Sequence, residues 1–519
     1  MSGKRVKLLV CTSVFIAGSN AFMHYAQGPA SKIQAALAIP RTWEDDSVAS
    51  LQVPLADPAY SPVHVSSQYY YDIPVRPIYK SFPIYAPHRE PVGYMQWLKE
   101  QEPEVAFDTS TLKTETDWIK AGEVVFEAPI THEEALGPLR MSNVRDPAWY
   151  EKTNMPLEVM SGALPFARYL IRQKGKIEVG NLSCAMCHVR VMPDGTSIKG
   201  AQGNFPFDRV IAFNLRERTA QAKDKQQRLG QIRLSRRFLF GSPWLKPDPQ
   251  AQIEEMSAEE IASAHESIPP GVIARHGTSP FSPAQVPDLI GVRERQYLDQ
   301  TGLVRHRTIS DLMRYAALNQ DMDAFARYGD FVPARVFEDL RFGGLERGRY
   351  SDEQLYALSL YLYSIKPPPN PNKLDALAAS GRAVFQRQGC GVCHTPPLYT
   401  NNQLTPAEGF AVPEDHSHRY DVLPIYVGTD PKLALKTRRG TGYYKVPSLK
   451  GLWYRGPLEH SGSIANLEDW FDPRRTLEGY VPSGFRGHGV TAKPVKGHAF
   501  GLGLSTKDRE ALIAFLRTL

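Results

Sequence analysis

Cys184-Ala185-Met186-Cys187-His188 and Cys390-Gly391-Val392-Cys393-His394 are two copies of one pattern, two cysteines separated by two residues and followed at once by histidine. This C-x-x-C-H pattern is typical of c-type haem attachment, in which both thiols bond to one porphyrin and the histidine binds its iron. A zinc site would need four ligands in one place, whereas these pairs lie in opposite halves of the chain. Disulfides would explain the thiols but not the histidines. The sequence therefore predicts two covalently attached c-type haems, with Cys184, Cys187, Cys390 and Cys393 as anchors and His188 and His394 as proximal ligands.

The segments around the two motifs are related by an internal duplication. Residues 380–385 (SGRAVF), shortly before the second motif, match residues 121–126 (AGEVVF), and Val286-Pro287-Asp288-Leu289 pairs with Val446-Pro447-Ser448-Leu449. In the same alignment Arg295 matches Arg455, Leu298 matches Leu458 and Gly302 matches Gly462. We interpret this as one haem module that was copied, with later insertions at 129–175 and 200–280 of the first copy.

Helical periodicity places helices near both modules. Apolar residues recur at helical spacing over 374–385, where Gly389 ends the helix, and again over 355–365 and 512–519. Ser351 with Gln354 forms a capping box, and Ser505 with Asp508 caps the last helix. The expected fold is mainly α. The predicted parts are listed along the chain: 1–21 export signal, 22–114 extended segment, 115–345 N-terminal haem domain, 346–372 bridging helix and Pro-rich linker, and 373–519 C-terminal haem domain.

The N-terminal residues resemble an export signal. Lys4, Arg5 and Lys7 precede a short apolar run, and Ser19-Asn20-Ala21 supplies small residues for cleavage. The run is shorter than a membrane span, although an uncleaved N-terminal anchor is the alternative. No other stretch approaches a membrane span, so we expect an exported, periplasmic protein, which also suits covalent haem attachment. Residues 29–114 are rich in Pro and Tyr and lack helical periodicity until about Gly93, which predicts an extended segment packed around the haem modules.

Charge and composition exclude several classes of protein. Hydrophobic residues make up 42% and charged residues 22% of the 519 residues, which are globular proportions. Three of the cations behind the net charge of +6 lie in the signal segment, so the remaining charge is too small for a nucleic-acid-binding surface.

The distal axial ligands decide what each haem does, because a strong ligand favours electron transfer and an open site can bind small molecules. No methionine follows Met322, so the second haem has histidine candidates only: His498, which we favour because it directly precedes the last helix, with His460 and His488 as alternatives. For the first haem, Met192 is too near His188, and His265, His276 and His306 lie in polar segments. Pro193 and Pro396 suggest loops whose carbonyls could orient the proximal rings.

The order of these motifs resembles that of the bacterial di-haem cytochrome c peroxidase superfamily, which includes MauG-type enzymes and haem rubber oxygenases. The resemblance covers residues 115–519 and is strongest at 380–397, at Lys445–Arg455 and at His460-Ser461-Gly462-Ser463. It implies two mainly helical cytochrome c domains. It also implies that the N-terminal haem is catalytic, the C-terminal haem relays electrons, and a calcium ion is often held between the domains.

The chain departs from the peroxidases at three points. Leu298 stands where they carry a Trp between the haems, their distal Gln has no clear counterpart near residues 311–315, and the second haem has His rather than Met candidates. These departures bring the chain nearer to the rubber-oxygenase branch, and a hydroperoxide-cleaving site would need a distal acid–base group.

Three functional hypotheses follow. The leading one is an oxidoreductase whose first haem activates peroxide or dioxygen, while the second exchanges electrons with it and with a small redox partner protein; an organic molecule could also be the substrate. The second is an electron carrier with both irons six-coordinate, and the third is a sensor or assembly subunit. Arg455 is the favoured partner of a haem propionate because Arg295 occupies the equivalent place. Arg438 and Arg439 are either further propionate partners or part of a solvated basic loop.

Overall fold

The computed structural model describes residues 38–132, 138–339 and 348–519, without the side chains of 320–323 and 337–339. The predicted export signal therefore lies outside the described residues. Residues 39–519 cluster as one unit. No helix in the described ranges combines the length and apolar character that crossing a membrane requires.

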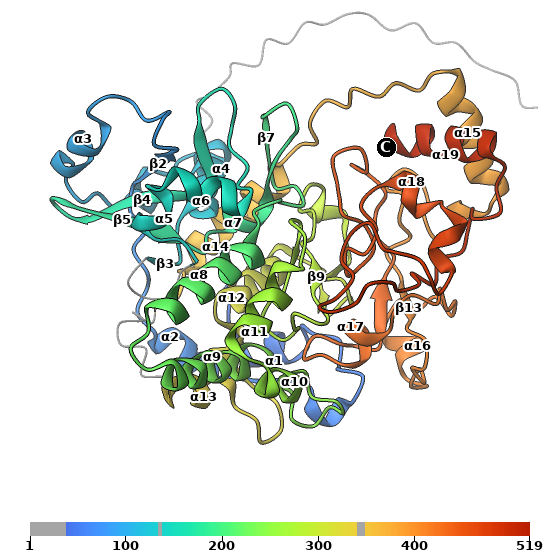
Figure 1. The fold of residues 1–519 in the computed structure, drawn as a ribbon, viewed down its shortest axis with the longest axis horizontal. Helices are drawn as coiled ribbons and strands as arrows, with labels where there is room; N and C mark the ends of the chain where they lie inside the picture. The colour runs from blue at the N-terminus through green and yellow to red at the C-terminus, as the bar shows by residue number, and fades with distance from the viewer. Residues whose placement is uncertain (1–37, 133–137, 340–347) are drawn as a thin grey trace, which may run out of the picture. The chain divides into compact units, whose positions relative to one another are not determined.

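The fold is mixed rather than mainly α, which corrects the expectation from sequence. Helix accounts for 38% and strand for 13% of the structure. The strands that matter most form a four-stranded antiparallel sheet in the order β2-β4-β5-β3 (Figure 1), with bounds β2 Ser81–Tyr85, β4 Ala163–Gln173, β5 Lys176–Asn181 and β3 Thr131–His132. The N-terminal segment supplies β2, the first insertion supplies β3 and β4, and β5 directly follows that insertion. No strand was predicted in these regions.

Two helix pairs flank the haem motifs and pack in the same way. Helix α4 (Glu115–Glu127) packs against α14 (Asp352–Ser364), and α15 (Ala376–Arg387) packs against α19 (Thr506–Arg517). A Cβ placed on Gly122 would lie 2.0 Å from the carbonyl oxygen of Ala357, and one on Gly381 would lie 1.8 Å from that of Ala511. Glycine is therefore needed at both crossings, because the helix backbones touch there.

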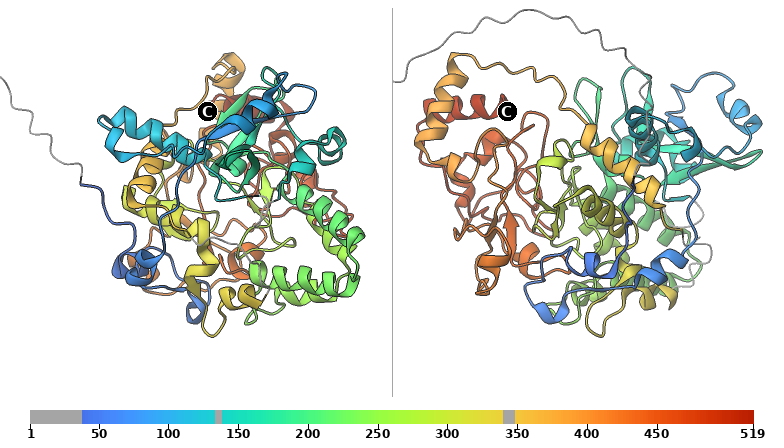
Figure 2. Two further views of the ribbon diagram at one scale, coloured as in Figure 1. Left: turned by 90° about the vertical axis from the view of Figure 1, so that its left-hand side faces the viewer. Right: turned by 180° about the vertical axis from the view of Figure 1, so that it is seen from behind.

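The predicted helix ends agree with the structure. The capping box of Ser351 and Gln354 begins α14, the Ser505 side chain accepts from the Asp508 amide at the start of α19, and Gly389 follows α15 at φ 71°. An extended linker leads from α14 to α15 and is visible from behind in Figure 2.

The two Val-Pro loops, residues 286–302 and 446–462, share an unusual backbone. Asp299 and Glu459 both adopt φ 69°, a left-handed conformation that is uncommon outside glycine. Leu298 pairs with Val304, and Leu458 forms an isolated bridge with Ile464. We call these segments the first and the second Val-Pro loop.

The second insertion is helical and the N-terminal segment contains short elements. The insertion folds into α8 Phe207–Gln221, α9 Lys225–Phe240, α10 Pro249–Glu255 and α11 Ala258–Glu266. The N-terminal segment holds α1 Asp45–Ala49, β1 Val63–His64 (paired with β12 Ala326–Arg327), α2 Ser67–Asp72 and α3 Tyr94–Glu100. Its aromatic residues pack in the core, since Tyr70 stacks on Trp43 at 4.6 Å between ring centroids.

The other named elements are η1 Pro58–Tyr60, η2 Thr109–Thr111, α5 Met141–Val144, α6 Pro147–Thr153, α7 Cys184–His188, β6 Val189–Val191, β7 Ser197–Lys199, β8 Val272–Ile273, β9 Ala284–Gln285, η3 Val292–Glu294, β10 Tyr297–Leu298, β11 Val304–Arg305, α12 Ile309–Phe325, α13 Pro333–Asp339, η4 Cys390–Val392, β13 Leu404–Pro406, α16 His416–Arg419, α17 Lys432–Leu435, β14 Tyr443–Lys445, α18 Leu467–Trp470 and η5 Pro473–Thr476.

Candidate haem sites and the pocket between the Val-Pro loops

The first C-x-x-C-H motif forms the short helix α7. The Ser183 side chain caps this helix by accepting a hydrogen bond from the amide of Met186. Cys184 and Cys187 form no disulfide, and burial raises the pKa of the Cys184 thiol to about 12 and that of the Cys187 thiol to about 11. Nδ1 of His188 lies 3.0 Å from the carbonyl oxygen of Pro287 in the first Val-Pro loop, so the other ring nitrogen is left for a metal.

The second motif begins in the 3-10 turn η4. Cys390 and Cys393 likewise form no disulfide. Nδ1 of His394 lies 3.2 Å from the carbonyl oxygen of Tyr399, and the backbone carbonyl of Pro447 in the second Val-Pro loop is a further acceptor for this ring.

The Val-Pro loops present equivalent proline carbonyls to the two histidines, that of Pro287 to His188 and that of Pro447 to His394. The prediction that a loop at Pro396 supplies an acceptor is confirmed for His394, since Tyr399 lies in that loop. The prediction for Pro193 was wrong, because the chain returns to His188 through the distant first Val-Pro loop. The matching Val-Pro sequences were the signal that could have identified these acceptors.

His498 lies opposite His394 at a distance that suits a shared metal. The centroids of the two rings are 6.2 Å apart. Two imidazoles that bind one iron from opposite faces have centroids roughly 6 Å apart, because each metal–nitrogen bond is about 2 Å long and each nitrogen lies about 1 Å from its centroid. Burial of the ring and the neighbouring His394 lower the pKa of His498 to about 4, so the ring is neutral and able to bind a metal at pH 7.

Hydrogen bonds from Arg475 stabilise the left-handed backbone conformation of His498. His498 has φ 43°, and Gly497 before it has φ 83°. The buried guanidinium of Arg475 donates to the carbonyl oxygens of Gly497 and His498, both at 3.0 Å. The Trp470 ring lies 5.2 Å from the His498 ring between centroids. Strained conformations of this kind are maintained where the surrounding structure fixes a functional side chain.

The two alternative ligands of the second haem have other contacts. The ring of His460 stacks on Tyr444 at 4.4 Å, and its Nδ1 pairs with Glu459. His488 lies near the carboxylate of Glu260 at the surface. The geometry therefore brings His498, and neither alternative, next to His394.

The three histidines considered for the first haem are positioned differently. Both ring nitrogens of His306 form hydrogen bonds, Nδ1 with the carbonyl oxygen of Arg295 at 2.7 Å and Nε2 with the hydroxyl of Tyr363 at 2.6 Å. The His276 ring contacts Phe238. His265 is buried, with Nδ1 2.6 Å from Asp208, while its Nε2 has no hydrogen-bond partner among the described residues.

The charge of Arg275 acts on two residues of the first motif, Cys187 and His188. Burial, with a further contribution from Arg275, lowers the pKa of His188 to about 4. The guanidinium donates to Asn319 at 2.5 Å and lies 3.6 Å from Asp299. Sequence reasoning missed Arg275, because it stands within a predicted insertion and matches nothing in the second copy.

Arg438 and Arg439 are buried, which contradicts the alternative of a solvated basic loop. Nε of Arg439 donates to Asp299 at 2.8 Å, and Arg438 donates to the carbonyl oxygen of Phe238 at 2.8 Å. Although burial alone would raise the pKa of Asp299, the guanidinium groups of Arg439 and Arg275 hold it well below its usual range. Arg439 thus joins the first Val-Pro loop to the C-terminal part of the chain.

Arg295 and Arg455 occupy equivalent places in the two loops. Arg455 donates to the carbonyl oxygens of Ser448 at 2.8 Å and Lys450 at 3.1 Å. Arg295 donates to the equivalent carbonyls, those of Asp288 and Ile290. Each arginine therefore stabilises its own loop, whichever further partner it has.

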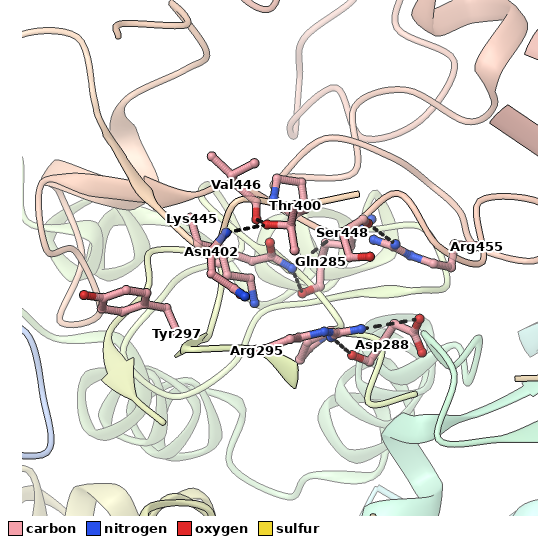
Figure 3. A pocket seen from close by; sticks show the side chains of 13 residues that line it. Gln285, Asp288, Arg295, Tyr297, Thr400, Asn402, Lys445, Val446, Ser448 and Arg455 are labelled. Carbon is pink, nitrogen blue, oxygen red and sulfur yellow. Dashed lines mark hydrogen bonds and ion pairs between the residues drawn. The ribbon is translucent and has the colours of Figure 1, made fainter. Parts of the chain in front are cut away.

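A pocket lies between the two loops (Figure 3). Its lining consists of Gln285, Pro287, Asp288, Arg295, Tyr297, Gln300, Thr400, Asn402, Lys445, Val446, Pro447, Ser448 and Arg455. Burial and the nearby Arg295 lower the pKa of Lys445 to about 7. Lys445 was part of the quoted motif but was not singled out, since one lysine before a Val-Pro pair carries no signal by itself.

Comparisons with known proteins found remote likenesses among solved structures. No protein-family model matches the chain. No curated protein matches it. A crystal structure of a MauG-like protein associated with microbial copper homeostasis matches with 17% identity and a TM-score of 0.21, over 32% of this chain and 56% of that one. Hydrazine synthase of Kuenenia stuttgartiensis matches with 14% identity and a TM-score of 0.26, over 59% of this chain and 92% of that one.

These TM-scores are too low to support an inference about function. The evidence for haem binding is therefore the two C-x-x-C-H motifs and the geometry around them. Within the described ranges, no group of three or more His, Cys, Asp or Glu side chains is placed to hold a metal ion. The calcium ion thus rests on the family resemblance alone.

Proposed function

We propose that the protein is a di-haem c-type cytochrome that acts as an exported oxidoreductase of the cytochrome c peroxidase and MauG superfamily. Cys184 and Cys187 would anchor the first haem and Cys390 and Cys393 the second, with His188 and His394 as proximal ligands. The observation that carries the proposal is the placement of His498 opposite His394 next to a C-x-x-C-H motif, with ring centroids 6.2 Å apart. A haem in that position would supply a one-electron redox centre.

The two haems would have different roles. His394 and His498 would ligate the second iron from both faces, which suits electron transfer, and Arg475 would keep His498 in place. The first haem would keep an open or exchangeable position, because His306 is bonded at both nitrogens and His276 packs against Phe238. Peroxide or dioxygen would bind there, and a small redox protein would exchange electrons with the second haem.

The packing of the helices suggests where the modules end. Since α14 packs on α4 as α19 packs on α15, we place α14 in the N-terminal module rather than in a bridge. The first module would then extend from about residue 115 to the end of α14. The export signal and periplasmic location follow from residues 1–21 and remain part of the proposal.

Optical and EPR spectra of the oxidised protein test this proposal. We expect one low-spin haem and one high-spin or ligand-exchangeable haem, and carbon monoxide binding to the first haem after reduction. Two low-spin haems in every redox state, with no carbon monoxide binding, would contradict the hypothesis of an enzyme. That result would support the alternative hypothesis of a non-catalytic electron carrier.

One observation favours the alternative of an electron carrier. His265 is oriented by the carboxylate of Asp208 and has a buried, unpartnered Nε2 among the described residues, an arrangement typical of metal-binding histidines. If His265 ligates the first iron, His265→Ala creates a high-spin haem and new carbon monoxide binding. If the first haem is open, the variant leaves its spectrum unchanged.

A further inference from the structure

The pocket between the Val-Pro loops has more cations than the chain neutralises. Lys445, Arg295 and Arg455 line it, against the single carboxylate of Asp288. Asp288 lies 3.8 Å from the Arg295 guanidinium and so neutralises that one cation, and it also accepts hydrogen bonds from the Tyr454 hydroxyl at 3.0 Å and from the Ile290 amide at 3.1 Å. The described residues of the chain supply no pocket-lining carboxylate for Lys445 and Arg455.

Two of the cations also have unused hydrogen-bond donors. Nε of Arg455 is buried without a partner, and in the described part of the chain the Lys445 ammonium has no hydrogen-bond acceptor, although the Lys445 amide donates to Gln300 at 3.1 Å. Charges withdrawn from water need a counter-charge, so the pocket fits an anion that the polypeptide does not supply.

The place of the pocket indicates which anion this is. Its wall includes Pro287, whose carbonyl faces His188, and Pro447, whose carbonyl faces His394. The wall of the pocket thus includes a residue in contact with each of the two histidines. Each haem carries two carboxylates, and arginine and lysine are the usual partners of such groups.

We propose that this pocket receives haem propionates from both attachment sites and that Lys445 is the cation that the two haems share. The inference rests on the proposed function, since it requires both haems. Lys445 would act as a positioning and tuning residue rather than as a catalytic one, because it would touch the carboxylates and not the irons. A positive charge between two redox centres stabilises the reduced form of each, so its loss should lower both potentials together.

Spectroelectrochemical titration of the full-length, matured protein tests this inference. We expect Lys445→Met to lower the midpoint potential of each haem by about 59 mV or more. For one electron, this shift corresponds to a tenfold change in the redox equilibrium constant. Lys445→Arg keeps the charge and should retain both wild-type potentials. Lys450→Met is the matched control, since that exposed lysine belongs to the same loop but lies outside the pocket lining, and it should shift neither potential.

Three results would overturn the inference: unchanged potentials in a Lys445→Met protein that carries two haems, a shift confined to one haem, or potentials of the wild-type protein that respond to added inorganic phosphate as to a competing anion. Lys445→Gln replaces Lys445→Met, with the same expectation, if the latter does not accumulate. A wild-type protein without haem would contradict the proposed function itself, and spectra before the titration distinguish the two failures.

Discussion

Near the second motif a histidine ring lies 6.2 Å from the proximal ring, whereas no such pairing is found among the described candidates for the first haem. Of those candidates, His306 is hydrogen-bonded at both ring nitrogens and His265 at Nδ1 alone. The scaffolds of the two regions are nonetheless alike. Each has a helix pair that crosses at a glycine and a Val-Pro loop with an acidic residue at φ 69°. The comparison teaches that the proximal side of each site is built by a repeated scaffold, while the distal side is set by loops that differ between the copies.

The largest expected effect concerns His498. Replacing it by alanine should convert the second haem from low spin to high spin, because its distal ligand is lost, while the first haem stays as it is. EPR and optical spectra of the oxidised variant measure this. His488→Ala is the control and should leave both spectra at wild type. A low-spin second haem in His498→Ala would refute the ligand assignment and return His460 and His488 as candidates.

The next effect concerns the acidic residues at the equivalent positions of the two loops. Asp299→Asn leaves the buried Arg439 without its counter-charge and should lower the free energy of unfolding by about 3–5 kcal/mol, as for one partner of a buried ion pair. Glu459→Gln removes the partner of His460 and should cost less, about 1–3 kcal/mol. Urea denaturation at pH 7 compares the two variants, and equal losses would contradict a special role of Asp299 in joining the halves of the chain.

The same pair predicts a pH dependence. Arg439 and Arg275 depress the pKa of Asp299 in the folded protein, so its contribution to stability is present above the unfolded carboxyl pKa of about 4. That contribution decreases as the pH falls further, toward the folded pKa. The difference in unfolding free energy between wild type and Asp299→Asn should therefore be constant from pH 5 to 7 and shrink below about pH 4. A difference that persists undiminished at pH 3 would exclude the ion pair as its source.

The smallest effect concerns the helix crossings. Gly122→Ala and Gly381→Ala each place a Cβ against a helix carbonyl and should cost about 1–3 kcal/mol, by similar amounts if the two pairs are equivalent. Gly230→Ala in α9 is the control, since nothing lies within 4 Å of its added Cβ, and should raise stability by about 0.5–1 kcal/mol. Thermal unfolding of the holoproteins measures all three, and a penalty at only one crossing would show that the pairs differ.

Sequence patterns with a local physical cause predicted the structure well. The helix before Cys390, the capping box of Ser351 and the glycine stop at Gly389 all depend on neighbouring residues and are present. The four-stranded sheet was missed because β4 is buried on both sides over much of its length and so lacks a clear alternation of polar and apolar residues. Its partner β2 comes from a distant segment that no local pattern connects to it.

In the candidate site, too, features with a local sequence pattern were predicted, and features that depend on contacts between distant segments were not. The motifs predicted which thiols and histidines belong together, and chain order pointed to His498. The carbonyls of Pro287 and Pro447, the cation Arg275 and the pocket around Lys445 depend on contacts between distant segments. For Arg438 and Arg439, charge predicted exposure or propionate binding, but the protein itself supplies their partners, a carboxylate for Arg439 and backbone carbonyls for Arg438.

Intact-mass and peptide-mapping mass spectrometry of the matured wild-type protein tests the central claim most directly. The account predicts a mass increase of two haems, with one haem on the peptide that contains Cys184 and Cys187 and the other on the peptide that contains Cys390 and Cys393. A protein with the mass of the bare polypeptide, or with four unmodified cysteines at these positions, would contradict it.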